Sequence, residues 1–132
     1  IENYEDAEFS RFKGIIFIKR KNPPFQHSYA LPGGFQEWGD SLEKTAVKEG
    51  KEETGLDIQL LTQLSVFSNP DRDPRGHVNS VCYIARAYGT PIGGDDAYDA
   101  RIFYLESTPA QLAFDHAKRL EEYKKWRQHH PR

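Results

Sequence analysis

Residues 41–54 form the clearest helix in the sequence and constrain the fold more than any other segment. Asp40 is a good N-cap residue, and Glu43 three positions later completes an arrangement similar to a capping box, with carboxylates near the positive end of the helix. Gly55 is placed to end the helix in a left-handed cap. We expect the apolar side of this helix to consist of Leu42, Ala46 and, less regularly, Val47.

Short apolar runs on both sides of this helix predict strands, and loops rich in glycine, proline and aspartate separate them. The runs occupy residues 14–20, 29–31, 56–68, 78–89 and 100–107. A second helix is expected from Asp115, a possible cap, to near Arg127, because apolar residues recur there at helical spacing. These are Leu120, Tyr123 and Trp126. The pattern predicts an α/β fold in which helices pack on a mixed sheet.

Composition limits the classes of protein and partner. A chain of 132 residues has room for one domain, and its formal net charge of −2 does not suggest nucleic acid or an anionic membrane surface as a partner. No apolar run approaches the length of a membrane span, and no signal peptide is recognisable. Cys82, the single cysteine, lies in an apolar run, so we expect a buried neutral thiol in a reducing, cytoplasmic setting. The chain begins at Ile1 and lacks methionine, so we expect part of the natural N-terminus to be missing.

The first helix carries three glutamates within residues 48–55, KEGKEETG. Glu49, Glu52 and Glu53 share one helix face, because positions three and four apart are neighbours there. Their mutual repulsion becomes favourable only around a cation, and hard oxygen ligands select Mg²⁺ or Mn²⁺, usually together with substrate phosphates. The spacing alone is also consistent with a solvated acidic face that is balanced by Lys44, Lys48 and Lys51.

Residues 34–56 resemble the signature of the Nudix hydrolase family, in which glycines and glutamates recur at fixed spacing. Three positions depart from it: Asp40 replaces a glutamate, Lys48 an arginine and Gly50 an aliphatic residue. Lys48 keeps the charge but loses the guanidinium fork, and Gly50 removes apolar bulk from the side expected to face the sheet. The matching positions are Gly34, Glu49, Glu52, Glu53, Gly55 and Leu56.

The resemblance implies a single Nudix domain over residues 1–132, folded as an α/β/α sandwich with a mixed sheet. It implies Mg²⁺ or Mn²⁺ as the cofactor, with Glu49 and Glu53 as the main ligands. Glu52 would be an additional ligand or would order a metal-bound water, and the carbonyl of Gly33 would be a further ligand. The expected reaction is cleavage by water of a nucleoside diphosphate linked to another group.

In this family the general base often comes from a loop outside the signature. The residues 90–100 contain three candidates, Asp95, Asp96 and Asp99, and we favour Asp96. For each of them, a role as a turn residue beside glycine is an equally good interpretation.

Three other stretches, residues 19–25, 68–85 and 112–123, resemble the ADP-ribose pyrophosphatase branch of the family. That resemblance implies AMP and ribose 5-phosphate as products. Phe35 or Trp38 would then stack on adenine, although a large aromatic side chain is more often a packing residue.

The loop of residues 69–77 supplies candidates for binding the substrate phosphates. Arg75 and Arg72 could contact phosphate, or could pair instead with nearby aspartates, Asp71 and Asp73. Arg20, at the end of the first predicted strand, is a further candidate, against ordinary solvation at the end of a strand.

Two alternative functions remain open from the sequence. One is an ADP-ribose-sensing Nudix domain of a transcription regulator, which requires the chain to be a fragment because no room remains for a DNA-binding domain. The other is hydrolysis of oxidised nucleoside triphosphates, which shares the metal site but leaves the loop of residues 69–77 unexplained. Relatives commonly form dimers, so a homodimer is also expected from the resemblance.

Overall fold

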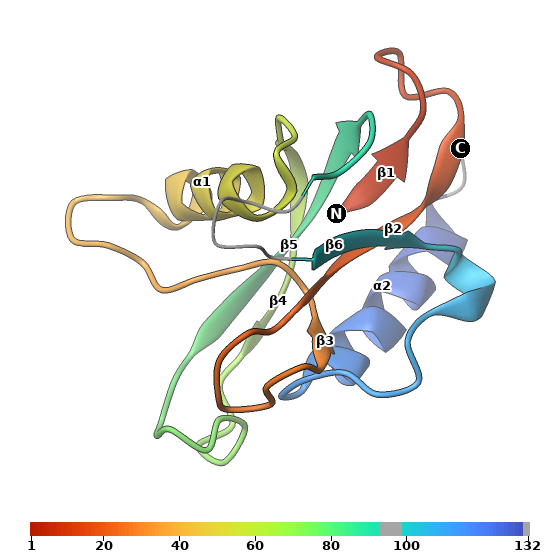
Figure 1. Ribbon diagram of the computed structural model, residues 1–132. Helices are drawn as coiled ribbons and strands as arrows, with labels where there is room; N and C mark the ends of the chain where they lie inside the picture. The colour runs from red at the N-terminus through yellow and green to blue at the C-terminus, as the bar shows by residue number, and fades with distance from the viewer. Residues whose placement is uncertain (93–98, 131–132) are drawn as a thin grey trace.

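The computed structural model describes residues 1–92 and 99–130 (Figure 1). Within these residues, six strands and two α-helices are present. In chain order the elements are β1 (Glu2–Tyr4), β2 (Phe12–Lys19), β3 (Tyr29–Ala30), α1 (Leu42–Thr54), β4 (Gln59–Phe67), β5 (Ser80–Tyr88), β6 (Asp99–Phe103), a 3₁₀ turn (Leu105–Ser107) and α2 (His116–His129).

The strands form one mixed sheet in the order β3-β2-β1-β5-β4, and β6 pairs with β2. The β1–β5 pair is parallel, and the other pairs are antiparallel. The two helices lie on opposite sides of the strands (Figure 1). The predicted α/β sandwich with a mixed sheet is confirmed.

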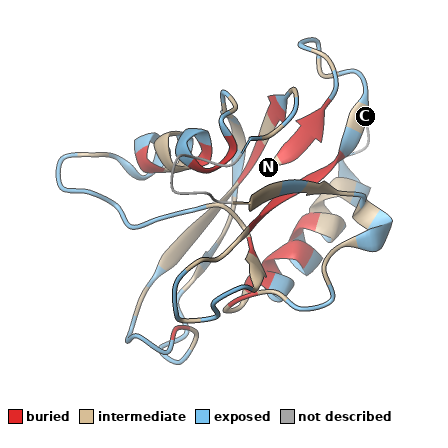
Figure 2. Ribbon diagram, viewed as in Figure 1, coloured by how far each residue is buried: buried red, intermediate tan, exposed pale blue. Residues whose placement is uncertain are grey.

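The core is built on the apolar run of β2. Ile15 and Phe17 of this strand cluster with Leu120 and Tyr123 of α2, and all four side chains are buried. Figure 2 shows this inner layer as buried ribbon between exposed loops. The predicted contribution of Leu120 and Tyr123 to the core is therefore confirmed.

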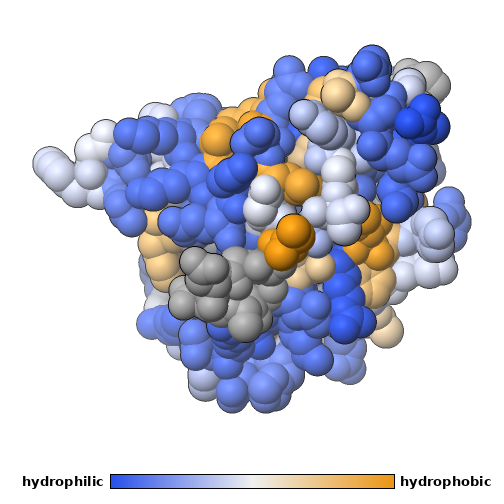
Figure 3. Space-filling model, turned by 45° about the horizontal axis from the view of Figure 1, so that its top comes forward, coloured by the Kyte–Doolittle hydropathy of each residue, from blue (hydrophilic) through white to orange (hydrophobic). Residues whose placement is uncertain are grey.

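Neither α1 nor α2 has the length and apolar character that a transmembrane helix requires. On the face shown in Figure 3, hydrophilic residues dominate and hydrophobic residues form small patches.

The cap of α1 differs from the prediction by one residue. Ser41, not Asp40, is the N-cap, and its Oγ accepts a hydrogen bond from the backbone N–H of Lys44 at 3.1 Å. Asp40 instead forms an ion pair with the Lys44 ammonium at 3.2 Å, so its carboxylate is not available to the helix backbone. The predicted end of the helix is confirmed, because Gly55 adopts the left-handed conformation with φ of 74°.

The predicted apolar side of α1 was wrong. Leu42 and Val47 are 40% and 37% exposed, and the buried side consists of Thr45, Gly50, Glu53 and Thr54. A side chain at Gly50 would place its Cβ only 2.7 Å from Cγ1 of Ile58. Ile58 therefore supplies the apolar bulk that glycine lacks, and the helix approaches it closely.

Three further elements differ from the sequence prediction. The strand β1 was not predicted, because its sequence carries no apolar alternation, yet Glu2–Tyr4 is buried between β2 and β5. The last strand stops at Phe103, where a 3₁₀ turn begins, rather than continuing to residue 107. The second helix extends past Arg127 to His129, and Asp115 precedes it without forming a side-chain cap.

The first turn of α2 is fastened to the loop that follows β3. The Nδ1 atom of His116 accepts a hydrogen bond from the backbone N–H of Leu31 at 3.0 Å. Burial, followed by the nearby charge of Arg119, lowers the pKa of His116 to about 3. The imidazole is therefore neutral at physiological pH, and its other nitrogen, Nε2, carries the proton.

Substitution of Gly50 tests the close approach of α1 to Ile58. We expect Gly50→Leu to lower the free energy of unfolding by about 1–3 kcal/mol, because the new side chain overpacks this contact. Urea unfolding measures the change. The double variant Gly50→Leu/Ile58→Ala should be more stable than the sum of the two single changes predicts, since truncation of Ile58 makes room. A Gly50→Leu protein as stable as the wild type would contradict this explanation.

The neutral state of His116 predicts how stability depends on pH. Its folded pKa lies below its unfolded value, so the unfolded chain binds the extra proton, and the stability present above about pH 6.5 is lost as the pH falls toward 3. His116→Gln cannot titrate there and keeps an acceptor for Leu31. Its free energy of unfolding should therefore fall less steeply between about pH 4 and 6, by up to about 1.4 kcal/mol per pH unit.

Guanidinium unfolding at a series of pH values measures this slope. His77→Gln, at an exposed histidine, is the matched control for replacing an imidazole with an amide. Identical slopes for His116→Gln and the wild type would show that His116 titrates normally in the folded protein.

Candidate active site

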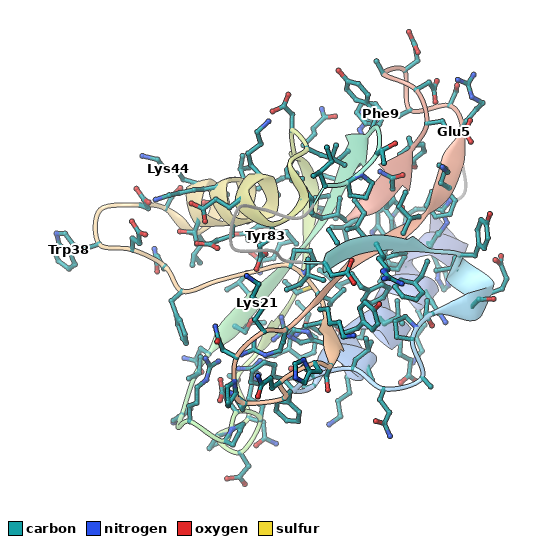
Figure 4. All side chains as sticks on the ribbon, in the orientation of Figure 1. Glu5, Phe9, Lys21, Trp38, Lys44 and Tyr83 are labelled. Carbon is teal, nitrogen blue, oxygen red and sulfur yellow. The ribbon has the colours of Figure 1, made fainter. Side chains whose placement is uncertain are left out.

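A cavity of about 860 Å³ joins the glutamates of α1 to the start of α2. The loop between β3 and α1, the strand β5 and the loop between β4 and β5 also contribute to its lining. In Figure 4, the labelled cavity residues Lys21 and Tyr83 lie in the region between α1 and β2. Most of the predicted site residues thus meet at one cavity.

Glu53 is the buried carboxylate of this cavity, and only 4% of the residue is exposed. It accepts a hydrogen bond from the backbone N–H of Gly33 at 2.8 Å. Burial raises the pKa of Glu53 to about 8, and the charges of Glu49 and Glu52 add to the shift, while the bond from Gly33 and the charge of Arg20 oppose it. A bound cation would compensate this carboxylate directly.

Glu49 lies one turn earlier and packs against the glycine turn. A Cβ atom on Gly34 would lie 2.5 Å from the carboxyl carbon of Glu49, so a larger residue here would displace the Glu49 side chain. Burial, followed by the charge of Glu52, raises the pKa of Glu49. The two glycines before α1 therefore hold the loop directly against the two inner glutamates.

The carboxylate oxygens of the α1 glutamates are chemically suitable ligands for a hard cation, although they are not arranged as a complete coordination sphere. Glu49 and Glu53 present carboxylate oxygens to the cavity, and Glu52 is exposed beside them. Among residues 1–92 and 99–130, no group of three histidine, cysteine or acidic side chains is close enough to hold a metal ion. A small cation that keeps several waters and binds substrate phosphates needs only one or two carboxylates from the protein.

Two departures from the signature are partners in the structure. The ammonium of Lys48 lies 3.1 Å from a carboxylate oxygen of Glu37 and 3.6 Å from one of Asp40. Lys48 thus ties the loop before α1 to the helix.

Trp38, at the tip of this loop, is fully exposed and points away from the body of the protein (Figure 4). It does not line the cavity, whereas Phe35 does.

The predicted substrate residues Arg20, Phe35 and Arg75 all line the cavity. The Arg75 guanidinium carbon lies 4.9 Å from the ring centre of Phe35 and 5.2 Å from that of Phe114. The Arg20 guanidinium lies 4.9 Å from the Phe114 ring. Phe114 thus positions both arginines through cation–π contacts.

The aspartate partners of the two loop arginines are now identified. Arg75 forms a two-point ion pair with the buried Asp73, with the closest contact at 2.7 Å. Arg72 is paired with Asp115 instead of Asp71, through hydrogen bonds of 2.9 and 3.1 Å. Arg72 is therefore a structural link between the loop and α2.

Phe114 and His116 were not predicted as functional residues, although both line the cavity. The backbone of Phe114 has φ of 52°, which is unusual for a residue that is not glycine and marks a strained site. In the sequence, the signal for these two residues was the aspartate–histidine pair directly before an apolar helical pattern.

The predicted bases Asp95 and Asp96 lie outside the described residues, and Asp99 forms an ion pair with Arg101 at 3.1 Å.

Cys82 was predicted to be a buried neutral thiol, and in the structure it is only partly buried. Burial raises the pKa of this thiol, although Arg119 opposes the shift. Cys82 is therefore a neutral thiol and not an activated nucleophile.

The chain is similar to known proteins. The chain is 49% identical over 123 residues to an ADP-ribose pyrophosphatase of Methanocaldococcus jannaschii, covering 92% of this chain and 72% of the relative. It is 33% identical to the ADPR responsive transcriptional repressor NtrR of Acinetobacter baylyi, covering 82% of this chain and 45% of that protein. The chain thus spans less than half of the repressor.

A solved structure and a family model give the same result. The NUDIX domain of Shewanella oneidensis NrtR, complexed with ADP ribose, superimposes with a TM-score of 0.72 at 30% identity, covering 84% of this chain and 75% of that one. The family model described as NUDIX domain matches residues 7–126. With the fold, the glycine turn and the glutamate helix in place, this match shows that the chain belongs to the NUDIX domain family.

Proposed function

We propose that this chain hydrolyses the pyrophosphate bond of ADP-ribose, or of a related nucleoside diphosphate derivative, to give AMP and ribose 5-phosphate. The observation that carries the proposal is the pair of the half-buried Glu49 and the buried Glu53, which lie against the glycine turn in a cavity that Arg20 and Arg75 also line. A substrate with two phosphates between two sugars requires both a cation site and further positive charge. The M. jannaschii pyrophosphatase supports the choice of ADP-ribose.

Mg²⁺ or Mn²⁺ is the cofactor that this donor set suits. Glu49 and Glu53 would hold the metal, with Glu52 and the carbonyl of Gly33 as further oxygen ligands. When bound, the metal neutralises the pyrophosphate charge and lowers the pKa of a water. The backbone N–H of Gly33 orients the Glu53 carboxylate before any ligand arrives.

The arginines and aromatic rings would orient the substrate. Arg75 is held between Phe35 and Phe114 and is anchored by Asp73, so its guanidinium has a defined position from which to bind a phosphate. Arg20 lies on the same ring of Phe114 and would bind the substrate beside it. Phe35 is 61% exposed and offers a ring on which adenine can stack.

The base that accepts the proton of water has two candidates in our proposal. Glu52 is exposed beside the inner glutamates and is free to move toward a water molecule. Asp96 is the candidate from outside the signature. Loss of turnover in Asp96→Asn with activity retained in Glu52→Gln would assign the role to Asp96, and the reverse result would assign it to Glu52.

A domain that binds ADP-ribose without cutting it is the second candidate function. The similarity to NtrR and to the NrtR domain complexed with ADP ribose favours this alternative. Two departures from the family signature also pointed to this alternative, but both have local explanations, since Lys48 pairs with Asp40 and Gly50 accommodates Ile58. We therefore rank hydrolysis of ADP-ribose first and hydrolysis of oxidised nucleoside triphosphates last. A cytoplasmic setting and a homodimer remain predictions.

The central test is release of AMP from ADP-ribose in the presence of Mg²⁺, compared with nucleoside triphosphates, dinucleoside polyphosphates and nucleotide sugars. ADP-ribose should give the highest kcat/KM, and EDTA should abolish turnover. Tight binding of ADP-ribose without turnover of any compound would reject the enzyme and support the sensor.

Substitution of the buried glutamate tests the site itself. Glu53→Gln should lower kcat by roughly 100-fold or more, because an amide is a poor ligand for Mg²⁺. Its melting temperature should not fall, since the amide oxygen still accepts the Gly33 bond and the amide is neutral, like the protonated carboxyl that burial favours. Glu121→Gln, at an exposed position of α2, is the matched control and should retain full activity. Unchanged kcat in Glu53→Gln would remove Glu53 from the metal site.

A further inference from the structure

The segment directly before α2 runs beside β3 at the point where the chain leaves that strand for α1 (Figure 1). Leu112 and Tyr29 form a parallel bridge, and the backbone N–H of Ala113 donates to the carbonyl of Tyr29 at 2.9 Å. These residues therefore pair with β3 as a short additional strand would.

This pairing ends after one step, because the chain turns away at Phe114. In a parallel ladder that continued, the N–H of Leu31 would donate to the carbonyl of Ala113. Phe114 instead has a left-handed φ of 52°, and the Ala113 carbonyl accepts from the backbone N–H of His116 at 3.1 Å. The Leu31 N–H therefore needs an acceptor from elsewhere.

The imidazole of His116 supplies this acceptor. Its Nδ1 atom accepts from the Leu31 N–H at 3.0 Å, and the side chain lies in the buried first turn of α2. A ring nitrogen that accepts from a backbone N–H carries no proton, so the proton of the neutral ring is on Nε2. His116 thus replaces a main-chain carbonyl at the point where the pairing with β3 ends.

Leu31 is also the first residue of the turn that holds the buried glutamate. Two positions later, the N–H of Gly33 donates to the Glu53 carboxylate at 2.8 Å. Pro32 lies between them, and its ring restricts φ and stiffens the link. The imidazole and the carboxylate are therefore connected by three residues of backbone, and a shift at Leu31 would move the Gly33 donor.

We propose that His116 is a positioning residue for the carboxylate that holds the metal. By fixing Leu31, it fixes the N–H of Gly33 and, through that donor, the orientation of Glu53. The inference rests on the proposed metal site and deepens it, because it assigns the support of an α1 glutamate to a residue of α2, on the other side of the sheet (Figure 1).

Two variants separate the acceptor from the bulk of the side chain. His116→Leu removes the acceptor of the Leu31 N–H, whereas the side-chain oxygen of His116→Asn can take the position of Nδ1. His129→Leu makes the leucine change at an exposed position of the same helix and is the matched control. If His116→Leu does not fold, His116→Ala removes the acceptor without adding the bulk of leucine and takes its place.

Amide hydrogen exchange of the metal-free chain, followed by NMR, tests the link directly. His116→Leu should accelerate exchange at Gly33 roughly tenfold, and His116→Asn should restore most of the protection. The N–H of Gly55, which donates to the carbonyl of Lys51 at the other end of α1, is the internal control and should keep its rate. Unchanged exchange at Gly33, or equal acceleration at Gly33 and Gly55, would overturn the proposal.

Binding of Mn²⁺ without substrate, measured by EPR of the free ion, tests the consequence for the metal site. His116→Leu should weaken the affinity roughly tenfold, and His116→Asn and His129→Leu should stay within about twofold of the wild type. A loss of melting temperature in His116→Leu with wild-type affinity for Mn²⁺ would show a purely structural role and overturn the proposal.

The same measurements keep this inference separate from the proposed hydrolysis. Wild-type chain that binds Mn²⁺ and hydrolyses ADP-ribose, with His116→Leu equal to it in both, would remove the positioning role alone. Wild-type chain that binds Mn²⁺ without turnover would reject the enzyme, while weaker binding in His116→Leu would still support the positioning role. Absence of Mn²⁺ binding in the wild type would reject both the metal site and the positioning role.

Discussion

Burial of the Glu53 carboxylate is the constraint on which the rest of the site depends. The helix α1 turns part of its glutamate face toward the protein, where the carboxylate meets a single backbone N–H from Gly33. Because burial raises the pKa of Glu53 to about 8, the folded protein holds an acidic group in a place that disfavours its charge. Such a group is costly to a structure without a ligand and useful to a site that binds a cation.

Close approach of backbone and helix makes this burial possible. Glycine at position 34 lets the turn lie against Glu49, and glycine at position 50 lets α1 settle against Ile58. At both positions a Cβ atom would overlap a neighbouring side chain, Glu49 or Ile58, which would have to shift. The Ile58 side chain thus fills the space beside the unusual Gly50.

Positive charge also lines the cavity, and only the three-dimensional structure assembles it. Arg20 and Arg75 come from segments far apart in the sequence and meet on the ring of Phe114. Arg72 and Arg119 meet on Asp115. The sequence predicted Asp115 only as a helix cap. Its ion-pair partner Arg72 lies more than 40 positions away, and local sequence patterns do not indicate such distant partners.

The sequence by itself determined the α/β class, the helix of residues 42–54, the glycine at its end and the spacing of three glutamates. These features follow from local rules of capping, periodicity and spacing. Only the tertiary structure decided that Glu53 is buried while Leu42 is exposed, that Ser41 caps the helix because Asp40 pairs with lysine, and that Arg72 and Arg119 share Asp115. The physical reason is that burial and charge pairing depend on segments distant in sequence, which local patterns do not record.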